Sequence, residues 1–217
     1  MAGRMRRDEK ASATRESLLA AAERLFAEHG VHAVTHRQIT DAAGQGNNAA
    51  VSYHFGTKTD VIRALIRKHT EPMERIREGM MAEVDDSTDL RDWVACMVRP
   101  VAEHLESLGS PTWYARFMAQ VMADPALHAV MIEESLAISP SLRQLLHGLG
   151  RCPPDLPAGM LLERAVMARH LIVQMSVERE RALAAHAPTY QPTWYDTATD
   201  LIDAIVGLWQ APVTRST

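Results

Sequence analysis

Apolar residues recur at helical spacing along most of the chain, without the alternation that predicts β-strands. The first apolar stripe predicts a helix over residues 12–29, which Gly30 ends. Two short helices follow over about 36–43 and 48–55, and a long helix continues from Thr57 towards Met81 with a kink at Pro72. The pattern therefore predicts an all-α fold.

Capping signals define the two short helices. Thr35 and Gln38 form the T-x-x-Q pattern, in which a hydroxyl and an amide satisfy free backbone groups of the first turn. Gly44 ends the first helix because glycine tolerates left-handed backbone, and Asn47 or Asn48 is expected to cap the second. Two short helices joined this way are the helix-turn-helix arrangement, whose second helix can lie in the major groove of DNA.

The second short helix offers side chains that can hydrogen-bond bases or phosphates, and none is acidic. The alternative is a capped surface helix without a ligand, since Asn is common at caps for local reasons. The residues predicted to face DNA are Thr35, His36, Arg37, Gln38, Gln45, Gly46, Asn47, Asn48, Ala49, Ser52, Tyr53, His54 and Lys58.

Lys58 adds a second argument for DNA binding. A cation in the first turn of a helix opposes the helix dipole, and a phosphate bound there would be met by the lysine and the free amides together. The alternative is an exposed lysine that the helix tolerates at a cost of about a few tenths of a kcal/mol.

Downstream, proline and glycine divide the chain into further helices. One is expected over about 88–108, kinked near Pro100, and the next two begin at Ser110-Pro111 and Asp124-Pro125. Ser139-Pro140 breaks the last of these. Residues 148–157 are rich in proline and glycine and predict a boundary.

The last two helices, expected over about 160–183 and 195–209, differ in character because the first is apolar around most of its circumference. Such a helix needs cover on two sides, and one subunit covers one of them. A partner subunit is the economical explanation, and a hairpin buried within one chain is the alternative. The residues expected at a homodimer interface are Leu161, Ala165, Ala168, Ile172, Leu201, Ile202, Ile205 and Trp209.

Three motifs occur in order along the N-terminal part: LLAAAERLFAEHG at 18–30, T-x-x-x-I-T-x-A-A-G at 35–44 and AAVSYHFGTK at 49–58. Through them, residues 14–66 resemble the tetracycline-repressor (TetR) family. The chain departs from the family pattern by one extra residue at Gln45-Gly46-Asn47 and by Ser52 in place of a common aromatic. Both departures concern the operator sequence more than DNA binding itself.

The resemblance implies a homodimeric repressor that a small-molecule effector releases from a palindromic operator. Its domains would be a basic flexible arm (1–11), a three-helix DNA-binding domain (12–57) and a helical domain for effector binding and dimerisation (58–217). The last two helices of each subunit would form a four-helix bundle, and the helix from Thr57 to Met81 would carry the effector signal to the DNA-binding helices.

The resemblance also implies an effector pocket in the second domain. Methionine and aromatic side chains suit an irregular, largely apolar molecule, although such residues are ordinarily core, and polar residues such as Glu134 could orient it. The pocket is expected at Trp93, Met97, His104, Trp113, Phe117, Met118, Met122, Met131, Met167, His170 and Gln174.

Composition and charge agree with this interpretation. The net charge is −4, but residues 1–70 hold 11 Lys and Arg against 7 Asp and Glu, so the end with the helix-turn-helix is basic, as phosphate binding requires. No apolar run approaches the ~20 residues of a membrane span, and the N-terminus lacks a signal peptide, so a cytoplasmic protein is expected. Cys96 and Cys152 are expected to be reduced thiols.

Other function classes find little support in the sequence. The letters G-x-G-x-x-A at Gly44–Ala49 follow a helix, whereas a dinucleotide site needs a preceding strand, so we expect no enzyme and no cofactor. His32 and His36 lack further ligands at metal spacing, which leaves a metal-responsive regulator as an outside possibility. The main alternative is a helical DNA-binding dimer that responds to a protein partner or to no ligand.

Overall fold

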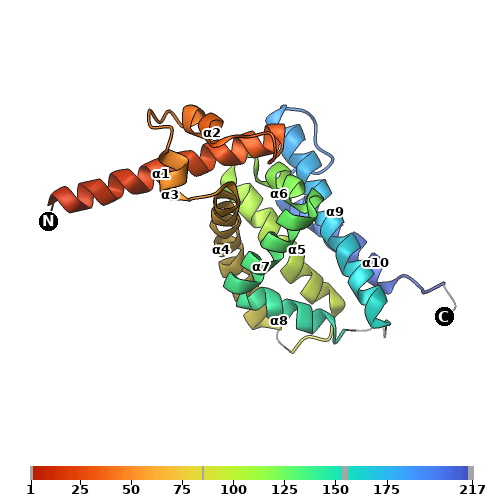
Figure 1. Ribbon diagram of the computed structural model, residues 1–217. Helices are drawn as coiled ribbons and strands as arrows, with labels where there is room; N and C mark the ends of the chain where they lie inside the picture. Colours follow the sequence, from red (N-terminus) through yellow and green to blue (C-terminus); the bar gives the residue numbers. More distant parts are fainter. Residues whose placement is uncertain (1, 85, 153–155, 215–217) are drawn as a thin grey trace. The chain divides into compact units, whose positions relative to one another are not determined.

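The computed structural model describes residues 2–84, 86–152 and 156–214, and all regular structure in these residues is helical (Figure 1). This confirms the predicted all-α fold. The helices are α1 (Ala2–His29), α2 (His36–Ala42), α3 (Ala50–His54), α4 (Lys58–Val84), α5 (Leu90–Leu108), α6 (Tyr114–Ala123), α7 (Pro125–Ile138), α8 (Pro140–Leu149), α9 (Ala158–Ala184) and α10 (Trp194–Gln210).

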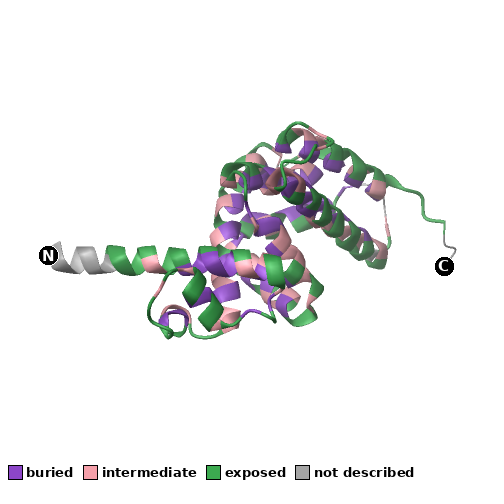
Figure 2. Ribbon diagram, turned by 90° about the horizontal axis from the view of Figure 1, so that it is seen from above, coloured by how far each residue is buried: buried purple, intermediate pink, exposed green. Residues whose placement is uncertain are grey.

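Helix α1 begins at Ala2, whereas the sequence predicts a flexible arm over residues 1–11. The expectation was wrong for residues 2–11 because Ala, Arg, Met, Glu and Lys are strong helix formers and a single interior glycine costs only about 1 kcal/mol. Figure 2 shows that burial begins further along the helix. Leu18, Ala22 and Phe26 are fully buried.

Two capping boxes fix the starts of α2 and α4. The Thr35 N–H donates to Gln38 Oε1 at 2.8 Å, and the Gln38 N–H donates back to Thr35 Oγ1 at 3.3 Å. Thr57 and Asp60 make the same reciprocal pair, at 2.9 and 3.2 Å. The first is the pair predicted from the sequence, and each pair satisfies backbone amides that a helix start leaves unpaired.

The helix breaks predicted downstream are present, with two differences. Helix α6 begins at Tyr114, beyond the predicted start at Ser110-Pro111. Ser139-Pro140 ends α7 as expected but also begins α8, because the Ser139 hydroxyl accepts the Leu142 N–H at 3.3 Å and proline suits the first helical position.

Helix α8 contains Gly148 because the indole of Trp93 packs directly against it. A Cβ at this position would lie 2.0 Å from a ring carbon of Trp93, so any side chain would displace the indole. The Trp93 Nε1–H donates to the Ser87 carbonyl at 2.9 Å, which fixes the ring from its other side. Because Gly148 belongs to α8, the loop that was predicted over residues 148–157 begins only after Leu149.

Contacts divide the chain into two compact units. The first runs to Lys68 and also contains Arg116–Glu134; the second contains His69–Ala115 and the described residues from Ser135 onward. This division differs from the predicted boundary at residues 57 and 58, since the start of α4 and parts of α6 and α7 pack with the N-terminal helices. Helices α4, α6 and α7 each continue from one unit into the other.

A buried polar network joins three segments of the second unit. Glu74 on α4 accepts hydrogen bonds from the Ser141 N–H at 2.8 Å and the Ser141 hydroxyl at 2.6 Å, and Arg77 donates to the Cys96 carbonyl at 3.2 Å. Burial would raise the pKa of Glu74, but hydrogen bonds from Ser139 and Ser141 and the charge of Arg77 together hold it below the ordinary value. Cys96 is a buried free thiol whose pKa burial raises to about 11.

Helix α9 turns one face into the second unit and the other outward. Ala168, Ile172 and Val177 are buried, whereas Leu162 is 69% exposed. The remaining exposed apolar residues of α9 continue the outward face: Val166, Met167, Leu171 and Met175. We refer to Leu162, Val166, Met167, Leu171 and Met175 as the outer face of α9.

Most residues predicted at the dimer interface lie inside the chain instead. Helix α10 packs extensively along α5. Helix α5 therefore covers the apolar face of α10, which we had assigned to a partner subunit. An apolar stripe in the sequence indicates that one face of a helix is covered, but it does not indicate which neighbour covers that face. Ala168, Ile172, Leu201, Ile202, Ile205 and Trp209 are buried, and Leu161 and Ala165 are partly buried.

Candidate nucleic-acid interface

The turn between α2 and α3 spans residues 43–49 and is held by its own backbone and one side chain. Gly44 has a φ of +66°, which a residue with a Cβ rarely adopts. Asn47 Oδ1 accepts the Ala49 N–H at 3.0 Å, and the Asn47 carbonyl accepts the Ala50 N–H at 2.9 Å. Helix α3 has no side-chain cap, so the expected Asn cap is wrong and Asn47 orders the turn before it.

Helix α3 is anchored to its neighbours on one side. Ala50 and Val51 are buried, and the guanidinium of Arg15 on α1 lies 4.9 Å from the ring centre of Phe55. His36 Nδ1 and Ser52 Oγ are 3.2 Å apart and link α2 to α3. These contacts fix the direction in which the other face of α3 points.

That other face is exposed and polar. Tyr53 is 82% exposed, and the side chain of Arg37 on α2 is 79% exposed, with its Nε 3.7 Å from Asp41. Side chains this exposed gain little from packing within the chain. Of the remaining predicted DNA contacts, Thr35, Gln38, Gly46, Asn47, Asn48, Ala49 and Ser52 are exposed, and His36, Gln45, His54 and Lys58 are partly buried.

Lys58 has a contact that the sequence did not reveal. Its Nζ donates to the Val31 carbonyl at 3.1 Å and to the His32 carbonyl at 3.3 Å. The amine therefore ties the start of α4 to the loop after α1, which explains a cation in the first turn without a phosphate. An ammonium has three donors, so these two bonds leave one for a phosphate.

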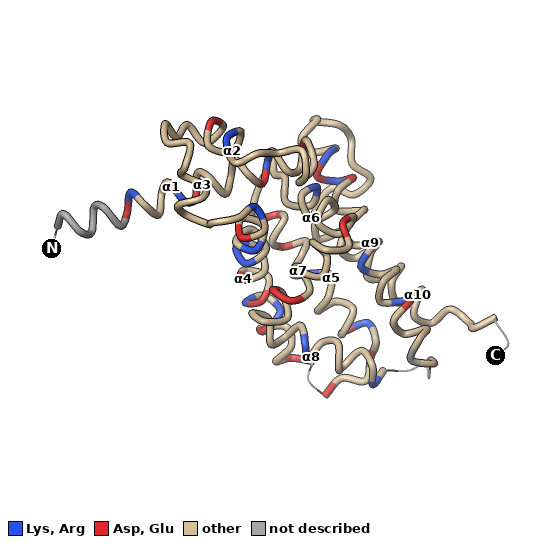
Figure 3. Tube along the Cα trace, in the orientation of Figure 1, with Lys and Arg blue, Asp and Glu red and all other residues tan. Residues whose placement is uncertain are grey.

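Two ion-pair clusters hold residues 116–134 against the N-terminal helices within the first unit. His32 Nε2 lies 2.7 Å from Asp124 Oδ2 at the start of α7. Glu134 on α7 accepts from Arg67 Nε at 2.6 Å and also pairs with Arg63, both on α4. Figure 3 marks basic positions along α4 and acidic positions on α7. We call Arg63, Arg67 and Glu134 the α4–α7 clamp.

The charge states of these carboxylates follow from their partners. The hydrogen bond from Arg67 lowers the pKa of Glu134; burial opposes this, and Arg63 adds to the lowering. The backbone N–H of Leu127 and the ring of His32 lower the pKa of Asp124. Glu134, which we expected to orient an effector, is therefore an ionised partner of two arginines.

The residues predicted to form the effector pocket are divided between the two units. Phe117 stacks on Phe26 at 6.1 Å in the first unit, and Met131 is also buried there. His104 lies in the second unit, with its Nε2 2.8 Å from His69 Nδ1. Trp93 is buried, Met97, Trp113, Met118 and Met122 are partly buried, and Met167, His170 and Gln174 are exposed.

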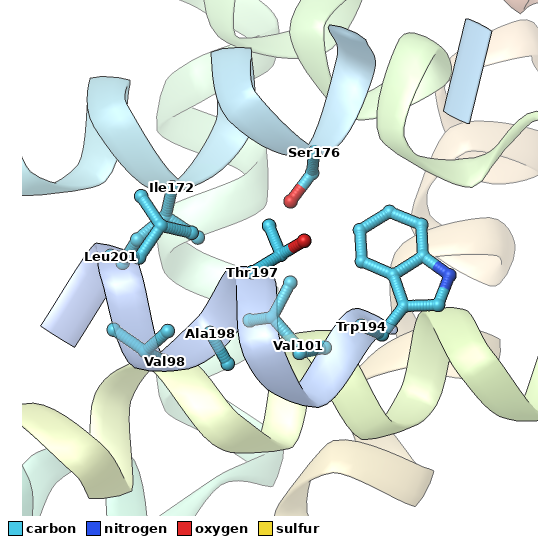
Figure 4. Close-up of a pocket in the computed structure, with 9 residues that line it drawn as sticks. Val98, Val101, Ile172, Ser176, Trp194, Thr197, Ala198 and Leu201 are labelled. Atoms are coloured by element: carbon cyan, nitrogen blue, oxygen red, sulfur yellow. The ribbon is translucent and has the colours of Figure 1, made fainter. Parts of the chain in front are cut away.

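The structure instead describes a pocket between α5, α9 and α10 in the second unit (Figure 4). None of the predicted pocket residues lines it. Periodicity could not have indicated it, because its walls come from the buried faces of three helices that are distant in sequence. Its lining residues are Val98, Val101, Ala102, Ile172, Ser176, Trp194, Thr197, Ala198 and Leu201.

Known proteins resemble the chain in its DNA-binding part and in its fold. Residues 18–65 match the family described as bacterial regulatory proteins, tetR family. The repressor AcnR of Corynebacterium glutamicum is 26% identical over 157 residues, which are 70% of this chain and 76% of AcnR. The chain belongs to the TetR family of transcriptional regulators.

Further relatives of this TetR-family chain differ in how much they share with it. A transcriptional repressor of Mycobacterium tuberculosis is 35% identical over 89 residues, 39% of this chain and 47% of that protein. The solved structure of the fatty acid degradation regulator FadR from Bacillus halodurans has a TM-score of 0.58 at 17% identity, covering 92% of this chain and 97% of that one. At this identity the structural match concerns the fold alone.

As a TetR-family regulator, the chain is a DNA-binding protein and not an enzyme. In the part of the chain that the structure describes, no helix is long and apolar enough to cross a membrane. The same residues contain no group of three or more His, Cys, Asp or Glu placed to hold a metal ion. His32 and His36 are engaged separately, with Asp124 and Ser52.

Proposed function

We propose that this TetR-family regulator is a homodimeric repressor that binds a palindromic operator through α2, α3 and the turn between them. The observation that carries the proposal is the exposed, polar surface of α3 and the turn before it, residues 43–54, which contains no acidic residue and is held in place by the buried side of α3. Because α3 is short and well anchored, its exposed groups are presented in a fixed geometry, as base recognition requires.

The dimer is proposed to form through the outer face of α9. Five apolar side chains on one helix face are exposed in the single chain, and Leu162 is the most exposed of them at 69%. A contiguous apolar face is typical of an interaction surface. A second copy of the chain is the occupant because two-fold symmetry also supplies the two half-sites of a palindrome.

Release from DNA is proposed to follow effector binding in the second unit. Helix α4 is continuous from Lys58 to Val84 and belongs to both units, so a change at one end is transmitted along one rigid element. In two-state terms, the operator favours one arrangement of the dimer and the effector favours another, and the coupling is reciprocal. The alternative is a dimer that responds to a protein partner or to no ligand.

Selection of duplexes from a random library by the full-length protein, at near-physiological salt, tests the proposal. We expect a palindrome whose half-sites lie about one helical turn apart, ~34–36 Å. Retention of all sequences alike, with binding that salt abolishes, would contradict sequence-specific recognition.

Ligand dependence separates the two forms of the proposal. Loss of operator binding on addition of a small molecule supports effector control. Operator binding that changes only when a second protein is added supports the alternative.

A further inference from the structure

We propose that Arg164 and Arg179 are positioning residues of the dimer: they fix the register of α9 on α10, and so the direction in which the outer face of α9 points. The inference rests on the proposed function, because that function assigns the dimer to the outer face of α9. Both arginines and the groups that they bind lie in the second unit. We call Arg164 and Arg179 the α9 anchors.

The first anchor binds the C-terminal end of α10. Arg164 is 6% exposed, and its two terminal nitrogens donate to the carbonyl of Trp209 and, at 2.5 Å, to that of Ala211. The last carbonyls of a helix have no partner within the helix and carry the negative end of its dipole. A guanidinium placed there joins α9 to the end of α10 by two charge-assisted hydrogen bonds.

The second anchor binds the segment that leads into α10. Arg179 is 7% exposed, and it donates to the Gln191 carbonyl at 2.6 Å and to the Pro192 carbonyl at 3.0 Å. Its guanidinium carbon lies 5.0 Å from the ring centre of Trp194, the first residue of α10. The two anchors therefore hold opposite ends of α10.

The spacing of the anchors along α9 matches the length of α10. They are 15 residues apart in the sequence, which is a little over four helical turns and about 22 Å. Helix α10 has 17 residues and would span about 25 Å. The anchors thus lie within roughly 60° of each other around α9, and the antiparallel α10 meets one of them at each end.

The middle of the contact between α9 and α10 is less directional. Residues of both helices, among them Ser176 and Thr197, line a space of about 10 Å³, room for one water molecule (Figure 4). Helix α10 also packs more extensively on α5 than on α9. Apolar contacts have no preferred direction, whereas hydrogen bonds do, so the register of α9 depends on the anchors at the two ends.

The burial of these cations points to control of geometry. Among the described residues, neither anchor makes an ion pair with a carboxylate, and the Nε–H of Arg179 has no acceptor. Burial lowers the pKa of Arg179, and the more distant charges of Asp196 and Glu106 oppose this. Well-packed apolar residues often replace buried ionic groups without loss of stability. Stability alone therefore does not require arginine at these two positions.

Sedimentation of full-length Arg164→Met and Arg179→Met tests the anchors, because methionine keeps an aliphatic side chain and removes the donors. If about a third of the chains keep α9 in the dimer-ready register, the dimer weakens roughly tenfold, since both subunits must be ready. We expect a loss of this size in each variant. Arg181→Met on the same helix is the matched control: its side chain is 60% exposed and bonds Glu178 at 3.4 Å, so the dimer constant should change by less than about twofold.

Two further readouts separate positioning from general destabilisation. An ammonium can donate to two carbonyls, so Arg164→Lys and Arg179→Lys should regain most of the lost dimer affinity. On a Leu162→Glu background, which removes the proposed interface, the methionine variants should melt at nearly the same temperature as their parent. The residues Pro192 and Ala211 are exposed, so their carbonyls can bond water instead. Dimer affinity that falls only in step with the melting temperature would overturn the proposal.

The register of α9 is measured directly by double electron–electron resonance. Spin labels are placed at Gln174→Cys on α9 and Ala204→Cys on α10, both exposed positions, with Cys96 and Cys152 replaced by alanine. On the Leu162→Glu background, we expect one narrow distance distribution with both arginines present, and a broadened or shifted distribution in each methionine variant.

The outcomes distinguish the anchors from the interface that they serve. An unchanged distance distribution would overturn the proposal, and so would a broadened distribution in a protein whose dimer constant is that of the wild type. If the Leu162→Glu protein still dimerises, the interface assigned in the proposed function fails. The label distances then still decide whether the two arginines fix α9 on α10.

Discussion

At the scale of single residues, the surface around α3 separates side chains that hold the turn from side chains that can reach DNA. Asn47 bonds the Ala49 N–H, and His36 meets Ser52, so these groups define the geometry. Tyr53 is largely exposed, as is Arg37. We therefore expect specific recognition to depend on Tyr53 and Arg37. The position of α3 is expected to depend on Asn47, His36 and Ser52.

Tyr53→Ala should weaken operator binding roughly five- to hundredfold, equivalent to about 1–3 kcal/mol, if its side chain contacts a base or phosphate. The melting temperature should change little, because the side chain is 82% exposed. Fluorescence anisotropy with the selected duplex and thermal unfolding measure the two effects. Tyr190→Ala is the matched control, since Tyr190 is fully exposed but far along the chain; an equal loss of DNA affinity in both variants would contradict the assignment.

Lys58→Met removes the amine and keeps the aliphatic stem. If the third donor of Lys58 meets a phosphate, affinity should fall alike for all duplexes and the slope of log affinity against log salt should drop by about one. The melting temperature should also fall, because the Val31 and His32 carbonyls lose their donor. A loss of affinity confined to one base pair, or an unchanged salt slope, would show that Lys58 does not contact a phosphate.

At the scale of elements, the α4–α7 clamp binds two helices through one buried carboxylate. Glu134→Gln should destabilise the protein by roughly 1–3 kcal/mol, because two arginines lose their charged acceptor. Since ionisation of Glu134 is favoured in the folded state, this stabilisation is present above about pH 4.5 and is lost as pH falls through the lowered pKa. Denaturant unfolding at several pH values measures it.

Glu133→Gln is the control for the clamp. Glu133 is the neighbour of Glu134, its side chain is 69% exposed, and it lies 3.4 Å from Arg63. An exposed pair contributes little, so this variant should lose no more than about 0.5 kcal/mol. Equal effects of the two variants, or a difference that does not shrink as pH falls below about 4.5, would contradict the account of the clamp.

The two faces of α9 predict different outcomes for two kinds of substitution. Leu162→Glu, on the outer face, should give folded monomers, whereas Ile205→Glu would place a charge in the interior and unfold the second unit. Sedimentation and circular dichroism separate the two outcomes. Leu146→Glu on α8 is the control, as Leu146 is 51% exposed; a Leu162→Glu protein with the mass of the wild-type dimer would exclude the outer face of α9 as the interface.

How far the sequence predicts the structure differs between local and distant features. The capping box of Thr35 and Gln38, most helix breaks and the short helices of the helix-turn-helix follow from signals within a few residues, and they are present. Lys58, Glu134 and the apolar face of α10 contact residues that lie 26 to more than 60 positions away in the sequence. The periodicity of apolar residues does not encode such contacts. None of the residues predicted for the effector pocket lines the pocket between α5, α9 and α10, since methionines and aromatics predict burial but not which of them share a cavity.

At the scale of the whole molecule, the chain is built as two units that share helices. The first contains the helix-turn-helix together with Arg116–Glu134, and α4, α6 and α7 continue from it into the second. Of these, α4 begins at Lys58, directly after the helix-turn-helix, so a change in the second unit has a continuous helical route along α4 to the predicted DNA-binding residues. In the proposed function, regulation acts through the arrangement of the two protomers rather than through unfolding of the DNA-binding helices.

The most direct test of this account is the mass of the complex on a selected operator. Full-length protein is mixed with the palindromic duplex and with a duplex of equal length carrying one half-site, and sedimentation or mass photometry counts the chains bound. We expect two chains on the palindrome and at least about a hundredfold weaker binding to the half-site. One chain bound equally well to both duplexes would contradict a dimeric, sequence-specific regulator.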